Sequence, residues 1–293
     1  MTAGTTASEA ARPGRPPLWR RAGAIARMLR RHEIDVAAVR ALVATDASPE
    51  TAARTAARLR AALEELGPTF VKFGQMLGQR PDLLPEAAIA ELRRLEDAVP
   101  PFPSDEARTV VEREFGERIE RLFAEFEDAP LAAASIAQVH RATLHDGSRV
   151  AVKIQRPDLR PTIEADLELL GSLARRAARW IPAVGPLAPV DLVAEFADSL
   201  RRELDFRLEA QAAREVAAAL ADEPDLWVPG VIGGLSSERV LTTSYSSGRK
   251  LGTDWPREPD ARRRIADLLL RTYLRQVVEV GVFHADLHPG NVF

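Results

Sequence analysis

The sequence predicts an α+β fold in which helices come first and strand pairs follow. Residues 18–99 carry apolar residues at helical spacing and few β-branched runs. From residue 136 onward the apolar pattern changes to the period of two that is typical of strands, and Asp146-Gly147 is a hairpin signal. The order indicates a helical extension followed by an antiparallel sheet with helices packed against it.

Capping residues and prolines delimit the helices of the first part. Ser48 is placed as the N-cap of a helix that starts at Pro49, and the prolines of residues 100–103 form a boundary. Ser104, directly after that boundary, is placed as the cap of the next helix. We expect helices over residues 49–66, 68–79, 86–97 and 104–115.

Two strand pairs are predicted, with long helices between and after them. We expect strands over residues 136–144, 149–155, 226–232 and 238–245, and helices over residues 158–180, 190–221 and 259–280. The predicted organisation is a disordered tail over residues 1–17, a helical extension over 18–103, a sheet-bearing lobe over 104–252 and the start of a second lobe over 253–293.

Composition excludes several function classes. Lysine and arginine number 40 against 43 aspartates and glutamates, a formal charge of −3, which gives no electrostatic case for nucleic acid as partner. The absence of cysteine excludes disulfides, thiolate catalysis and cysteine zinc sites. Residues 1–17 lack the apolar stretch of a secretory signal, and no stretch approaches the roughly 18 uninterrupted apolar residues of a membrane-spanning helix. We expect a cytoplasmic chain, at most peripheral to the inner face of the plasma membrane.

The last ten residues, HADLHPGNVF, have the layout of a kinase catalytic loop. Asp286 is suited to orient a hydroxyl and take its proton, and Asn291, five residues on, is suited to hold a metal. Upstream, the VAVK segment carries Lys153 at the position of the lysine that holds the nucleotide phosphates in kinases. The alternative is an edge-strand lysine with its ammonium in solvent. The order of these motifs predicts a protein-kinase-like fold, with an N-lobe antiparallel sheet, an αC-type helix and a partial helical C-lobe.

The helix expected over residues 190–221 supplies acids that could pair with Lys153. Its candidates are Glu203, Asp205 and Glu209, and a surface pair on an arginine-rich helix is the ordinary alternative. The residues alone do not choose among them.

An alanine-rich turn stands where a kinase has its glycine-rich loop. It contains Ala132, Ala133, Ala134 and Ser135. Because alanine does not reach positive φ as glycine does, this loop should be stiffer and should approach phosphates differently.

The terminal segment also contains an H-x-D-x-H cluster. His284, Asp286 and His288 could form a catalytic zinc or iron triad, which would make the chain a metal-dependent hydrolase.

Five segments together resemble the UbiB (AarF/ADCK) family of atypical kinases. They are LGPTFVKFGQMLGQRPDLLP, PLAAASIAQVHRA, VAVKIQRP, RELDFRLEA and HADLHPGN, between residues 66 and 291. The first matches the family's K-x-G-Q signature at Lys72, Gly74 and Gln75. The fourth matches its E-x-D signature at Glu203 and Asp205.

The resemblance assigns roles to individual residues. It implies that Lys153 grips the nucleotide phosphates, that Glu209 is its helix partner and that the alanine-rich loop covers the nucleotide. It also implies that Asp286 is the catalytic-loop aspartate, that Asn291 is a magnesium ligand, and that ATP (or ADP) and Mg²⁺ are the cofactors.

The resemblance further implies that the K-x-G-Q helices fold over the active site, with Lys72 facing the E-x-D pair, which disfavours protein substrates. The implied function is an atypical kinase or ATPase that supports isoprenoid quinone (ubiquinone-type) biosynthesis at membranes. Its implied partners are nucleotide and isoprenoid lipid or quinone-synthesis enzymes. The alternative is a non-catalytic nucleotide- or lipid-binding scaffold for those enzymes. The second metal-binding aspartate of kinases would lie beyond Phe293, so we expect a truncated, inactive fragment.

Overall fold

Two compact units make up the chain. The computed structural model describes residues 18–35, 37–38, 42, 48–95, 99–178, 188–251, 256–283 and 292–293. One unit comprises residues 1–99 and 158–200, and the other comprises residues 100–157 and 201–293. We call them the helical unit and the sheet unit. Residues 158–200, expected beside the sheet, group instead with the amino-terminal helices. The predicted tail over residues 1–17 lies outside the described residues.

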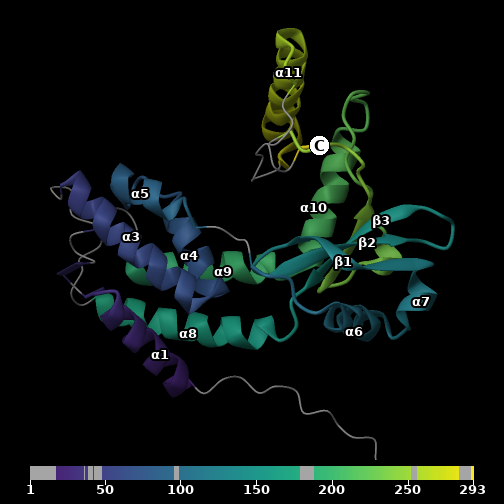
Figure 1. The fold of residues 1–293 in the computed structure, drawn as a ribbon. Coiled ribbons are helices and arrows are strands. Elements are labelled where there is room, and N and C mark those ends of the chain that lie inside the picture. Colours follow the sequence, from purple (N-terminus) through teal and green to yellow (C-terminus); the bar gives the residue numbers. More distant parts are fainter. Residues whose placement is uncertain are drawn as a thin grey trace, which may run out of the picture. The chain divides into compact units, whose positions relative to one another are not determined.

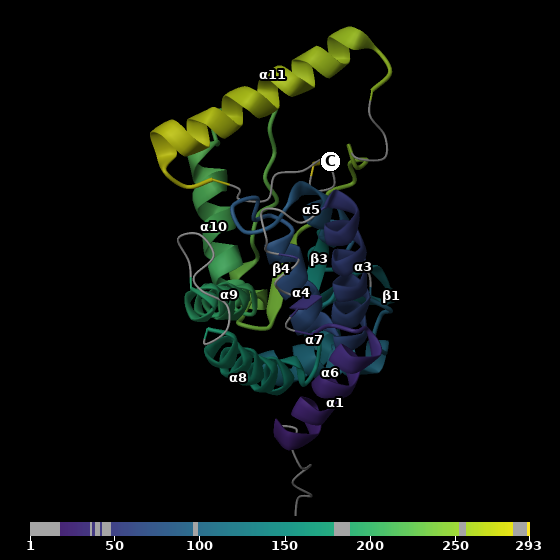
Figure 2. The same cartoon turned by 90° about the vertical axis from the view of Figure 1, so that its left-hand side faces the viewer.

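Six helices in the described residues build the helical unit. They are α1 (Leu18–Arg31), α3 (Pro49–Leu66), α4 (Pro68–Leu77), α5 (Glu86–Leu92), α8 (Leu159–Ala177) and most of α9 (Pro189–Glu203) (Figure 1). Ser48 caps α3 as predicted, because its hydroxyl accepts a hydrogen bond from the Thr51 N–H at 3.3 Å. Figure 2 shows α1 next to α3. The expected helix over residues 86–97 is shorter than predicted, since it ends at Leu92 and gives way to a turn.

An ion pair in the helical unit is almost fully buried. Arg21 on α1 donates two hydrogen bonds to Asp166 on α8, at 2.5 and 2.9 Å. The Asp166 side chain is 1% exposed. Arg21 also donates to the Leu66 carbonyl at 2.7 Å and lies over the Phe70 ring. One arginine therefore links α1, the end of α3, α4 and α8.

Gly74 of the K-x-G-Q segment has a packing role. It is buried on α4, and a Cβ added there would overlap the side-chain ends of Leu63 and Leu95. Both leucines are buried, so neither end can move without disturbing its neighbours. The next residue, Gln75, donates to the Leu95 carbonyl at 3.2 Å. A larger residue at position 74 would therefore force these two buried side chains to shift.

The sheet unit contains a four-stranded antiparallel sheet with strand order β1-β2-β3-β4. The strands are β1 (Glu125–Ala133), β2 (Ala137–Thr143), β3 (Arg149–Gln155) and β4 (Val240–Ser244). The prediction missed β1, an edge strand with acidic residues, Pro130 and register irregularities on both sides of that proline. The strand predicted over residues 226–232 is wrong: its residue Val231 forms only an isolated bridge to Thr243, and a 3-10 turn, η1 (Gly233–Leu235), follows.

One face of the sheet is covered by α6 (Ser104–Phe115) and α7 (Ile119–Leu122) (Figure 1). The core between them contains Ala107, Val110, Val111, Ile119, Phe123, Phe126, Ala142, Val150, Val152, Ile154 and Val240. The helix predicted over residues 104–115 is confirmed, although Ser104 is its first residue and Pro103 occupies the N-cap. The opposite face of the sheet meets α10 (Phe206–Ala219).

The single helix predicted over residues 190–221 is wrong. The chain forms α9 and α10 with a break at Leu204 and Asp205, where the Asp205 side chain caps α10 by accepting the Arg207 N–H at 3.1 Å. The last predicted helix is present as α11 (Pro259–Arg275), continued by the π-helix η2 (Gln276–Val280). In the part of the chain that the structure describes, no helix is long and apolar enough to cross a membrane.

Candidate functional site

Lys153 lies on an inner strand of the sheet. Strand β3 pairs with β2 on one side and β4 on the other, with Val139 and Leu241 opposite Lys153. The edge-strand alternative for this lysine is therefore wrong. The neighbours Val152 and Ile154 point into the core under α6, and alternation sends the Lys153 side chain to the other face. There it is 30% exposed, so its ammonium can reach a ligand.

Two groups from α10 hold the Lys153 ammonium. Both carboxylate oxygens of Glu209 accept from Nζ, at 2.9 and 2.7 Å. The ammonium also lies 4.8 Å from the centroid of the Phe206 ring, which is fully buried. The Glu209 side chain is 48% exposed, so the pair contributes only ~0.2–1 kcal/mol to stability. The main consequence of the pair is that it fixes the direction of the Lys153 side chain.

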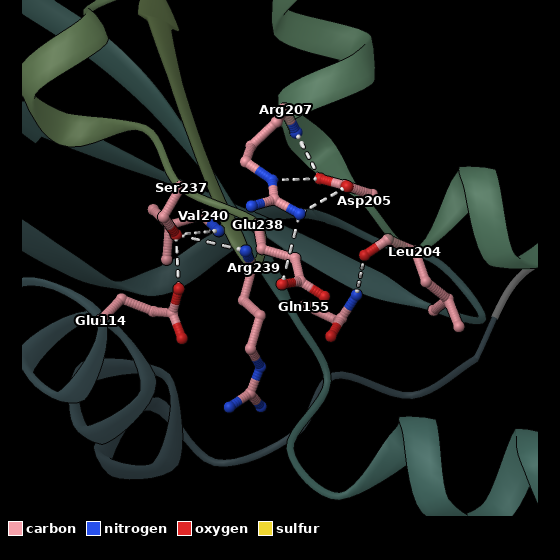
Figure 3. Close-up of polar contacts among 9 residues, drawn as sticks. All are labelled: Glu114, Gln155, Leu204, Asp205, Arg207, Ser237, Glu238, Arg239 and Val240. Carbon is pink, nitrogen blue, oxygen red and sulfur yellow. Dashed lines mark hydrogen bonds and ion pairs between the residues drawn. The ribbon is translucent and has the colours of Figure 1, made fainter.

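The first turn of α10 is fixed by polar contacts that Figure 3 shows. Asp205 accepts from the Arg207 guanidinium at 2.8 and 2.7 Å, and Arg207 also reaches Glu238 at 3.5 Å. The hydrogen bond to Asp205 raises the pKa of Arg207. The Phe206 N–H donates to the Glu238 carbonyl at 3.0 Å. Residue 238 lies two residues before the start of β4, so these contacts bind α10 to the segment that enters the sheet.

A serine fixes the start of β4 in the same view (Figure 3). The Ser237 hydroxyl donates to Glu114 of α6 at 2.6 Å and accepts from the N–H groups of Arg239 and Val240, each at 3.2 Å. Because α10 is bound to residue 238, the helix that carries Glu209 is held by a segment that is itself fixed to α6.

The alanine-rich turn is shorter than predicted. Ala132 and Ala133 belong to β1 and pair with Val139 and Gln138. The turn proper is residues 134–136, and the Ala134 N–H donates across it to the Ala137 carbonyl at 2.8 Å. None of these residues has positive φ, in accord with the absence of glycine. The Ser135 hydroxyl is buried and, among the described residues, has no hydrogen-bond partner.

The sheet face around Lys153 carries further candidate residues that the sequence did not indicate. Val139 and Ala151 are half-buried and flank the lysine on β2 and β3. Phe206 lies beneath the ammonium. The alternation of the VAVK strand could have indicated Ala151, which lies two residues before Lys153 on the same face.

The family-signature residues lie in two different units. Lys72, Gly74 and Gln75 are on α4 of the helical unit, whereas Glu203 and Asp205 flank the break before α10. Their pairing, and the regulatory role implied for them, stay predictions.

The residues expected at the catalytic loop lie outside the described residues. This applies to Asp286 and Asn291, and to His284 and His288 of the alternative metal triad. Within the described ranges, no group of three or more histidine, aspartate or glutamate side chains is arranged to hold a metal ion.

An antiparallel sheet whose inner-strand lysine is paired with a helix glutamate is the N-lobe arrangement of a kinase-like protein. In accord with this, residues 94–293 match the model of the ABC1 atypical kinase-like domain. The chain belongs to this family, the family of the UbiB proteins, and its fold is of the atypical kinase-like α+β class.

Curated relatives and a solved structure support this assignment. The chain is 41% identical over 240 residues to the "Probable protein kinase UbiB" of Aeromonas hydrophila, and 39% identical over 239 residues to that of Marinobacter nauticus. These matches cover 81% and 80% of this chain and 44% of each relative, so the chain spans under half of their length. A solved structure, the complex of Rv3197 with erythromycin from Mycobacterium tuberculosis, matches with a TM-score of 0.58 at 30% identity. That match covers 78% of this chain and 58% of the other.

Proposed function

We propose that the sheet unit binds a magnesium nucleotide, ATP or ADP, and that the protein is an atypical kinase or ATPase of the UbiB type. The observation that carries the proposal is the contact of Lys153 with Glu209 on the half-exposed face of the sheet. An accessible ammonium that is already oriented suits a polyphosphate, because charge-assisted hydrogen bonds are strong and need no rearrangement on binding.

Each described residue has a definite task in this proposal. Lys153 holds phosphate oxygens, Glu209 and Phe206 orient Lys153, and Val139 and Ala151 provide an apolar surface for the base. The alanine-rich turn covers the phosphates. The nucleotide supplies the transferable phosphoryl group. Asp286 and Asn291 are the residues expected to orient the acceptor and to hold magnesium.

Isothermal titration of residues 1–293 with ADP and ATP, with magnesium and with EDTA, tests the nucleotide site. Lys153→Met should weaken binding about tenfold or more, because a charged hydrogen bond contributes about 1.5–3 kcal/mol. The matched control is Arg149→Met, which removes an exposed cation from the same strand and should not change the affinity. Binding by Lys153→Met at wild-type affinity would reject the site.

Glu209→Gln tests the orienting role separately. This change keeps the shape of the side chain and removes its charge, so nucleotide should bind more weakly while the fold is retained. Glu215→Gln makes the same change at an exposed position of α10 and should have no effect.

We also propose that the protein supports isoprenoid quinone biosynthesis, with isoprenoid lipid or quinone-synthesis enzymes as partners. The support is its membership of the UbiB family. Introducing Lys153→Met into the gene that encodes this chain should lower the cellular quinone content, whereas Arg149→Met should not. Unchanged quinone in the Lys153→Met strain, with the protein present at normal level, would contradict a nucleotide-dependent role.

A further inference from the structure

We propose that Gln155 and Arg156 are positioning residues that hold the two elements beside Lys153 in place. Gln155 fixes the start of α10, which carries Glu209, and Arg156 fixes the alanine-rich turn. Gln155 is the last residue of β3, two residues after Lys153, and Arg156 directly follows the strand. The inference rests on the proposed nucleotide site for its effect on affinity, although the contacts themselves do not depend on it.

Arg156 holds the alanine-rich turn by donating hydrogen bonds to carbonyl groups of that turn. Its Nε donates to the Ala134 carbonyl at 3.0 Å, and its backbone N–H donates to the Ile136 carbonyl at 2.9 Å. The Ala134 N–H bonds to the Ala137 carbonyl on the other side of the turn. The carbonyls at both ends of residues 134–136 are therefore bound to a single residue, which directly follows β3.

The Arg156 side chain is itself held by the segment before α6. Its Nη2 donates to the Pro100 carbonyl at 2.7 Å, and its guanidinium lies 5.4 Å from the centroid of the Phe102 ring. The Phe102 N–H donates to Oε1 of the buried Gln138 side chain of β2 at 3.0 Å, and Nε2 of the same side chain donates to the Phe102 carbonyl at 3.2 Å. Burial lowers the pKa of Arg156. The guanidinium fork thus connects the turn to a fixed part of the sheet unit.

Gln155 performs the corresponding task for α10. Its side chain is 1% exposed, and Nε2 donates to the Leu204 carbonyl at 2.9 Å, at the break between α9 and α10 (Figure 3). Its backbone N–H donates to the Arg239 carbonyl at 2.9 Å. Alternation places Gln155 on the same face of β3 as Lys153. One strand face therefore contacts the segment that leads into α10 through Gln155, and the first turns of α10 itself through Lys153 and Glu209.

Fixing both elements before the ligand arrives should favour binding. A loop or helix that must be ordered during binding lowers the affinity, whereas a pre-organised one does not. Glycine lets the backbone of a glycine-rich loop approach the phosphates closely, but it also leaves the free loop less ordered. Here the alanine-rich turn and the Arg156 contacts together give a turn that is fixed in advance.

Hydrogen exchange of residues 1–293 without nucleotide tests the two contacts separately. The variants are Arg156→Lys, which keeps the charge but cannot reproduce the fork, and Gln155→Met, which keeps the length but removes the donor. Arg149→Lys, at an exposed position on the same strand, is the control. Two segments are followed: residues 130–140 for the turn and residues 204–212 for the start of α10. The affinity for magnesium ADP is measured in parallel.

Arg156→Lys should speed exchange in residues 130–140 by about tenfold and leave residues 204–212 unchanged, as expected for one lost charged hydrogen bond. Gln155→Met should speed exchange in residues 204–212 by a similar factor and leave residues 130–140 unchanged. Arg156→Lys and Gln155→Met should each weaken magnesium ADP binding about tenfold. The control Arg149→Lys should change neither the exchange rates nor the affinity.

Wild-type exchange rates in both segments of Arg156→Lys and Gln155→Met would overturn the inference. So would equal acceleration of the two segments in each variant, because that result indicates general destabilisation. A wild-type chain that binds no nucleotide would reject the proposed function instead, and the exchange rates would still decide whether the two residues position their elements.

Discussion

Replacing Asp166 by leucine is expected to destabilise the helical unit by about 3 kcal/mol. Leucine branches at Cγ as aspartate does, although its tetrahedral Cγ and two methyl groups are bulkier than a planar carboxylate, and the change removes the charge. Asp166 is 1% exposed and accepts two hydrogen bonds from Arg21. Breaking a buried ion pair from one side typically costs about 3–5 kcal/mol. The lower end applies here because the Arg21 side chain is 23% exposed and keeps its bond to the Leu66 carbonyl.

The double variant Arg21→Met with Asp166→Leu gives the decisive comparison. An apolar pair of similar volume often replaces a buried ion pair without loss of stability. The Leu66 carbonyl then lacks the donor that Arg21 supplied, so a deficit of about 1 kcal/mol should remain. The double variant should therefore be more stable than the Asp166→Leu single variant by about 2 kcal/mol.

Urea unfolding followed by circular dichroism measures these differences, with Arg27→Met on the exposed face of α1 as control. The control should change the free energy of unfolding by less than about 0.5 kcal/mol. A double variant as unstable as the single one would refute the reasoning, because the loss could not then come from a charge left without its partner.

Three further changes test other parts of the structure. Gly74→Ala should lower the free energy of unfolding by about 1–3 kcal/mol, since the new methyl overlaps buried leucine side chains; wild-type stability in urea would contradict this. Asp205→Ala removes the cap of α10 and should cost about 1 kcal/mol, whereas Asp205→Asn should retain most of it, as measured by thermal unfolding. Burial lowers the pKa of His140, so the unfolded chain takes up a proton before the folded chain does. Stability should thus be constant above about pH 6.5 and should fall as pH drops below it. His140→Gln should lessen that fall, and an identical pH profile for both proteins would show that His140 is not its source.

Local signals predicted those parts of the fold that depend on local chemistry. Ser48 and Pro49 marked the start of α3, and the apolar VAVK run placed Lys153 in a strand. The family resemblance selected Glu209, which the residues alone had left equivalent to Glu203 and Asp205.

The missed features depend on partners that are distant in sequence. The break between α9 and α10 has no glycine or proline and is stabilised by Gln155 and by the carbonyl of Glu238. Strand β1 contains Pro130 and acidic residues, and only pairing with β2 identifies it as a strand. The holding role of Arg156 could not be read from its neighbours in sequence, because its acceptors are carbonyls of residues 100 and 134.

The hairpin between β2 and β3 decides on which side of the sheet Lys153 appears. Its tip has Gly147 at φ 84° and closes through the Leu144 and Ser148 backbone. Because side chains alternate with a period of two, a one-residue slip of β3 in its pairing would turn Lys153 into the core and expose Val152 and Ile154. An insertion or deletion at the hairpin tip that shifted this register would therefore invert the site without altering any of its residues. The length of this turn is thus as much a part of the site's definition as the identity of the lysine.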